Sequence, residues 1–114
     1  MDKNTLRTIK IKTGVLKRSL KDYYSYKEEA KKLDEKVDKL KEDGADEHDV
    51  IKQTEVMKES LDMLPACKTK IESALEDLKS VIVDEEQAEE FKESDEGKNA
   101  SAVCAEADEF IENY

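Results

Sequence analysis

The chain has 114 residues, the length of one domain, and 44% of them are charged whereas only 5% are aromatic. Three glycines and one proline leave few turn formers, a composition typical of long helices and unfavourable for β-sheets. No secretory leader or long apolar run is found, so we expect a soluble protein of the cell interior, without a membrane partner. There, Cys67 and Cys104 would stay reduced as buried packing residues, although a disulfide remains open.

The net charge of −10 is unevenly distributed. Residues 1–43 hold 13 Lys or Arg and 9 Asp or Glu, a balance of +4, whereas residues 44–114 hold 7 and 21, a balance of −14. Solvated helix faces explain most of this pattern. The basic cluster in residues 7–21 would also suit a nucleic acid, but the acidic remainder repels phosphate. An anionic protein is therefore the favoured partner of the basic region, and no nucleic-acid partner is expected.

The first 42 residues carry apolar or small side chains at alternating steps of three and four, which predicts a helix over about 5–42, capped by Asn4 or Thr5. We call such a row on one helix face the seam. Ile11 and Val15 lie beside it and should widen the buried face, and Gly14 should allow a close helix approach. The seam positions are Leu6, Ile9, Thr13, Leu16, Leu20, Tyr23, Tyr26, Ala30, Leu33, Val37 and Leu40.

Residues 42–46 predict the first turn, with Gly44 in the left-handed conformation and Asp46 capping a second helix over about 47–92. Pro65 lies near the middle of this helix, so either one helix is kinked there or two helices meet. The seam keeps its seven-residue steps across the proline, from Leu64 to Ile71 to Leu78. A turn would normally reset this spacing, so one kinked helix is favoured. The seam positions are Val50, Thr54, Met57, Leu61, Leu64, Ile71, Leu75, Leu78 and Ile82.

The segment 84–98 is strongly acidic, and residues 94–99 predict a second turn around Gly97. Asn99 or Ser101 should cap a last helix over about 99–113, too short to be stable without docking on the other two. The seam positions are Ala100, Val103, Ala107, Phe110 and Tyr114. The expected fold is all-α: one domain over residues 1–114, an elongated up-down-up three-helix bundle of coiled-coil type. Such a seam could close within one chain or be shared with a second copy, and a monomer is expected more than a homodimer.

No residue set in the sequence predicts an enzyme, a metal site or a cofactor. The single histidine, His48, falls at a predicted helix start and is expected to be an exposed turn residue, because a metal site needs several converging ligands. No glycine-rich phosphate loop is present. A solvated bundle also offers no apolar pocket that would raise the pKa of a carboxyl group.

Five ordered motifs are similar to the tubulin-binding cofactor A family. The segment Lys10–Arg18 (KIKTGVLKR) resembles the opening motif of that family, and Tyr26–Ala30 (YKEEA) resembles its next motif. Residues 43–46 (DGAD) fall where the first turn of that family lies. The pair Glu59-Ser60 followed by Met63–Cys67 (MLPAC) resembles its central signature, and Ile71–Lys79 resembles the stretch that follows. The resemblance spans about residues 6–82, and beyond Val83 the chain is similar in general character only.

The resemblance implies a small helical chaperone that uses no nucleotide. Members of this family capture β-tubulin released from the cytosolic chaperonin and hold it until other tubulin-folding cofactors assemble the αβ-heterodimer. It implies a cytoplasmic, cytoskeleton-associated protein whose kinked middle helix is important for β-tubulin contact. Two alternatives, both ranked below the cofactor because neither explains the ordered motifs, are a helical coiled-coil adaptor without a tubulin role and a basic-helix nucleic-acid binder.

The candidate β-tubulin contacts lie on two helices. On the second helix, Met63 is apolar yet off the seam, which suits an adaptable contact surface; the competing interpretation is that it widens the core. On the first helix, a basic face should meet an acidic tubulin surface and raise the association rate. The full candidate set is Lys10, Lys12, Lys17, Arg18, Lys52, Gln53, Glu59, Ser60, Met63 and Pro65.

Overall fold

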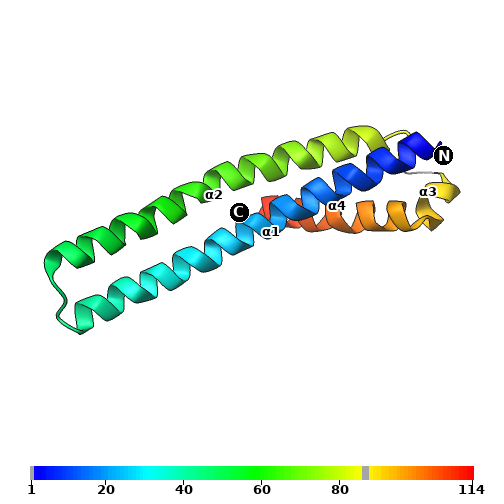
Figure 1. Cartoon of the computed structure of the whole chain (residues 1–114). Coiled ribbons are helices and arrows are strands. Elements are labelled where there is room, and N and C mark those ends of the chain that lie inside the picture. Colours follow the sequence, from blue (N-terminus) through cyan, green and yellow to red (C-terminus); the bar gives the residue numbers. More distant parts are fainter. Residues whose placement is uncertain (1, 86–87) are drawn as a thin grey trace. The chain divides into compact units, whose positions relative to one another are not determined.

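The computed structural model describes residues 2–85 and 88–114, and all regular secondary structure in these ranges is α-helical. Four helices follow in order (Figure 1): α1 (Lys3–Glu42), α2 (Glu47–Ile82), α3 (Glu89–Glu93) and α4 (Asp95–Asn113). The predicted all-α class is therefore confirmed for the described residues. Within the same ranges, none of the helices combines the length and apolar character needed to cross a membrane.

The second helix is shorter than predicted. It runs through Pro65 as one helix, which confirms the choice of one helix over two, but it ends at Ile82 instead of near residue 92. Val83 is exposed and the next seam place falls on Glu85, so continuing the helix would bury no apolar side chain. Helices gain most of their stability from such burial, which explains the early end.

The first helix begins two residues earlier than predicted. Asp2 precedes its first turn, and the Asp2 carboxylate accepts a hydrogen bond from the Asn4 backbone N–H at 2.9 Å. An Asp before the first turn satisfies a backbone donor that has no partner within the helix. The expected caps Asn4 and Thr5 are therefore helical residues instead.

The chain divides into two compact units. Unit 1 comprises Met1–Leu20 and Lys68–Tyr114, and unit 2 comprises Lys21–Cys67. In unit 1, the start of α1, the end of α2 and all of α4 contribute a common core (Figure 1). Its buried seam residues confirm the predicted spacing; they are Ile9, Thr13, Leu16, Leu20, Ile71, Leu75, Leu78, Ile82, Ala100, Val103, Ala107 and Phe110.

Four expectations about unit 1 are wrong. Ile11 and Val15 are 56% and 47% exposed, so they do not widen the core. A Cβ added at Gly14 would meet no atom within 4 Å, so this glycine serves no close helix approach. Tyr114 is exposed, although its ring lies 4.5 Å from the Lys68 ammonium. Finally, Gly97 belongs to a helix and not to a turn.

The junction of α3 and α4 explains the position of Gly97. Ser94 caps α4: its hydroxyl accepts from the Gly97 N–H at 3.0 Å and donates to the Phe91 carbonyl at 2.8 Å. The Phe91 side chain is buried, so α3 is fixed against the core by its ring. A Cβ on residue 97 would lie 1.8 Å from the Phe91 carbonyl oxygen, which glycine avoids. The cap is therefore Ser94, and the expected caps Asn99 and Ser101 lie within the helix.

Unit 2 is a hairpin made of the end of α1, a turn and the start of α2 (Figure 1). Gly44 has φ of +71°, the left-handed conformation expected of it. The Asp46 carboxylate accepts from the His48 N–H at 3.3 Å, which confirms the predicted cap, and His48 is exposed as expected. Because only two helices meet in this unit, the seam residues Met57 and Leu64 are half-buried.

Candidate partner-binding surface

The predicted contacts on α2 all lie in unit 2, but not on one face. Lys52, Glu59 and Met63 follow each other at steps of seven and four and therefore share a face, with all three side chains exposed. Gln53 and Ser60 lie beside that face and are half-buried. Pro65 is exposed and follows Met63 by two residues, a rotation of roughly 200° around the helix, so it points away.

Met63 is a surface residue in this hairpin. Its side chain is 41% exposed, which contradicts the interpretation that it widens the core. Val56, seven residues before it, is exposed to a similar extent and adds a second apolar side chain to the same face. We call Lys52, Val56, Glu59 and Met63 the Met63 face. Two apolar side chains interspersed with one cation and one anion can contact a protein partner without forming a large aggregation-prone patch.

The four predicted basic contacts on α1 lie in unit 1 and do not form one basic face. Lys10 and Lys17 are seven residues apart and share a face, whereas Arg18 is about 100° further around the helix. Lys12 lies on a different side again and is half-buried. These residues therefore cannot meet one flat partner surface simultaneously.

Carboxylates of the chain itself also neutralise part of this basic region. Lys10 and Lys17 line a groove of unit 1 together with Asp95, Glu96 and Glu106 of α4. Two cations and three anions give these groove residues a formal balance of −1. The electrostatic attraction of an acidic partner to this place is weaker than the sequence of α1 alone suggests.

Sequence reasoning missed several exposed apolar residues of unit 2. Val56 could have been found from its seven-residue spacing to Met63, whereas Leu61 was assigned to the seam and is 44% exposed. The exposure of Leu61 could have been anticipated from the shortness of the last predicted helix. At 1.5 Å per residue, the 19 residues of α4 extend about 28 Å and the 40 residues of α1 about 60 Å. One such helix cannot cover the seam along its full length.

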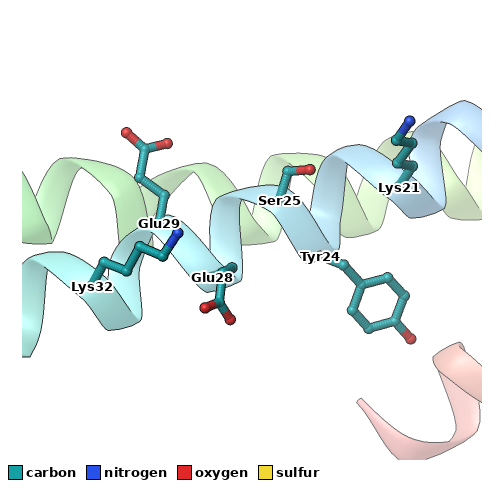
Figure 2. A pocket seen from close by; sticks show the side chains of 6 residues that line it. All are labelled: Lys21, Tyr24, Ser25, Glu28, Glu29 and Lys32. Carbon is teal, nitrogen blue, oxygen red and sulfur yellow. The ribbon is translucent and has the colours of Figure 1, made fainter.

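A second missed feature is the surface around Tyr24 on α1. Figure 2 shows the Tyr24 ring projecting from the side of the helix opposite to the Lys21 side chain. Both residues line a shallow hollow, together with Ser25, Glu28, Glu29 and Lys32. The Tyr24 ring contacts the buried ring of Tyr23 edge-on, with centroids 5.4 Å apart. All six lining residues come from one helix, so this hollow is shallow and does not enclose a volume.

The described residues contain no arrangement suited to holding a metal ion. Between residues 2 and 85 and between 88 and 114, no group of three or more His, Cys, Asp or Glu side chains could serve as ligands. Cys67 and Cys104 are both buried thiols. What the surface offers instead is a set of exposed helix faces with mixed charge and isolated apolar side chains.

Comparison with known proteins assigns these helices to a family. The family model described as "Tubulin binding cofactor A" matches residues 4–104, further than the motifs that end near residue 82. Human tubulin-specific chaperone A is 41% identical over 92 residues, which cover 78% of this chain and 85% of the human protein. Tubulin-folding cofactor A of Arabidopsis thaliana is 38% identical over 104 residues, 91% of each chain.

Solved structures of two relatives share the fold. The crystal structure of tubulin folding cofactor A from Arabidopsis thaliana superposes with a TM-score of 0.85 at 37% identity, covering 95% of this chain and 99% of that one. Human tubulin chaperone cofactor A gives a TM-score of 0.73 at 36% identity, with 91% and 98% covered. The motifs, the all-helical structure and these similarities lead to one conclusion: the chain belongs to the tubulin binding cofactor A family.

Proposed function

We propose that this protein is a tubulin-folding cofactor that captures β-tubulin released from the cytosolic chaperonin and passes it on towards αβ-heterodimer assembly. The observation that carries the proposal is the family match over residues 4–104, together with relatives named for tubulin folding. Such a role needs a binding surface and no catalytic group or cofactor. It places the protein in the cytoplasm, in association with the cytoskeleton and indirectly with other tubulin-folding cofactors.

The Met63 face is the proposed contact surface on α2, with Gln53 and Ser60 at its edge. Methionine has a flexible, polarisable side chain that adapts to irregular apolar surfaces, which suits a client that is not yet in its final fold. Exposed Lys52 and Glu59 lie on the same face as the two apolar side chains and can form hydrogen bonds with a partner. Pro65 would contribute through the shape of α2, since its side chain points elsewhere.

We also propose that the helices form a monomeric up-down-up three-helix bundle of coiled-coil type whose middle helix bends at Pro65. Proline has no backbone N–H, so the carbonyl of Leu61 loses its normal helical hydrogen-bond donor. Its ring also crowds the preceding turn, and both effects bend helices. A crystal structure in which α2 is straight through Pro65 would contradict this part of the proposal.

Size-exclusion chromatography with light scattering tests the function directly. The protein is mixed with β-tubulin dissociated from the heterodimer, and a stoichiometric complex is expected. Met63→Glu should weaken that complex by about tenfold or more, because a charge replaces an apolar contact. Val83→Glu is the matched control: it changes another exposed apolar residue, in unit 1, and should leave the complex unchanged. Absence of any complex with the folded, unaltered protein would refute the function and favour the helical adaptor.

The proposed role of the basic residues is a separate prediction. Lys17→Glu with Arg18→Glu should slow association with β-tubulin at low salt and have less effect at 0.5 M salt, since rim charges act through long-range attraction. Stopped-flow association rates at both salt concentrations provide the measurement. An unchanged rate at low salt would show that these charges do not guide the encounter.

A further inference from the structure

The hairpin of unit 2 carries a groove that the proposed Met63 face does not include. We define the hairpin groove by its lining residues, Lys27, Ala30, Lys31 and Asp34 of α1 and Met57 and Leu61 of α2, around a volume of about 330 Å³. Resting on the proposed function, we propose that this groove binds an acidic amphipathic α-helix of the captured tubulin chain.

The apolar character of the groove comes from the seam. Met57 and Leu61 occupy seam positions, where an apolar side chain is expected to be covered, yet Leu61 is 44% exposed. Unit 2 consists of parts of α1 and α2 alone, so its seam is covered from one side only. Two helices with a shared apolar seam present a site whose shape fits a third helix.

Unit 1 shows which kind of helix this seam accepts. There the same two helices, α1 and α2, bury α4, whose contacting residues are mainly small and recur at steps of three and four. Ala100 and Ala107 are fully buried, so α4 approaches its neighbours closely. The occupant of the hairpin groove should therefore present small or apolar side chains at the same spacing.

The charge of the occupant follows from the same comparison. The sequence of α4 holds six acidic residues and one lysine, a balance of −5. In unit 1, Lys10 and Lys17 of α1 line a groove with acidic residues of α4. In unit 2, Lys27 and Lys31 border the hairpin groove and outnumber Asp34, so they favour an occupant with carboxylates along its edges.

The hairpin groove can be tested separately from the Met63 face. Leu61 and Met63 are two residues apart, roughly 200° around the helix, so the two sites point in different directions. A change in one site leaves the side chains of the other in place. The expected fold-changes can therefore be assigned to one surface at a time.

Charge reversal in a matched pair of variants is the first experiment. Lys27→Glu with Lys31→Glu alters the groove, whereas Lys36→Glu with Lys39→Glu makes the same change in net charge on two exposed positions of α1 outside it. Binding of fluorescently labelled β-tubulin, dissociated from the heterodimer, is measured by anisotropy at low salt. The groove variant should bind about tenfold or more weakly and the control within about twofold. Circular dichroism verifies that both remain helical.

A photo-crosslinking amino acid at position 61 identifies the occupant. It replaces one exposed side chain, and mass spectrometry of the β-tubulin complex then locates the attachment site. Attachment within an acidic helical segment of β-tubulin is the expected result. Attachment to a strand or loop, or to a second copy of this chain, would overturn the inference.

The outcomes separate this inference from the proposed function. If the groove variant binds as tightly as the control while Met63→Glu is defective, the inference is wrong and the function stands. If the unaltered protein forms no complex with β-tubulin, both fail. A complex weakened by the groove variant but not by its charge-matched control, with attachment to an acidic helix, supports the inference.

Discussion

Replacing Gly97 with alanine should destabilise the protein, although alanine is the better helix former. Within a helix interior, replacing glycine with alanine normally raises the free energy of unfolding by about 1 kcal/mol. At this position the new Cβ would lie 1.8 Å from the Phe91 carbonyl oxygen and 2.7 Å from its carbon, far inside contact distance. These are backbone atoms of α3, so the two helices must separate, and overpacking of this kind costs about 1–3 kcal/mol. The separation also strains the Ser94 cap, worth about 1 kcal/mol. The expected net loss of stability is about 1–3 kcal/mol.

Gly14→Ala provides the matched control for the same chemical change. Its Cβ would meet no atom within 4 Å, so the helix preference acts alone and a gain of about 0.5–1 kcal/mol is expected. Urea unfolding followed by circular dichroism measures both free energies of unfolding. For a chain of 114 residues, 1 kcal/mol corresponds to about 4 °C in melting temperature. Equal stabilisation by the two alanines would refute the reasoning, since the Phe91 contact would then have no energetic consequence.

Two further substitutions, one in the turn between α1 and α2 and one on the surface, should change the stability by smaller amounts. Gly44→Ala should cost about 1–2 kcal/mol in urea unfolding, because φ of +71° brings a Cβ too close to the following carbonyl; an unchanged midpoint would show that the turn readjusts freely. Asp108→Asn breaks the 2.8 Å pair between Lys79 and Asp108, whose side chains are both about half exposed, and should cost at most about 0.5 kcal/mol at 0.15 M salt. A loss above 2 kcal/mol in thermal unfolding would contradict that assessment.

Much of the helical architecture was readable from the sequence. Steps of three and four located the buried residues of unit 1, because one face of a helix must pack while the other remains in water. Gly44 and Asp46 marked the first turn through conformational preferences that act within a few residues. The ordered motifs between residues 10 and 79 also identified the family, which the comparisons then showed. Each of these signals is local or repeats regularly along the chain.

The candidate surface was less predictable, since exposure depends on what packs nearby. Leu61 and Leu75 both occupy seam positions of α2, yet Leu75 is buried in unit 1 and Leu61 is exposed in unit 2. The basic residues of α1 looked unopposed until the fold placed α4 carboxylates along the same groove as Lys10 and Lys17.

The sequence by itself predicted α1, most of α2, α4, the buried seam of unit 1 and the family, but not the separate helix α3, because periodicity and short motifs are properties of the chain. Only the tertiary structure decided that α2 ends at Ile82 and that Gly97 is required against the Phe91 backbone. It also settled that Leu61 is exposed in the hairpin, which the shortness of the last predicted helix only suggested. The physical reason is that burial and steric contact are set by neighbours distant in sequence, and a pattern along one helix carries no information about where another helix ends.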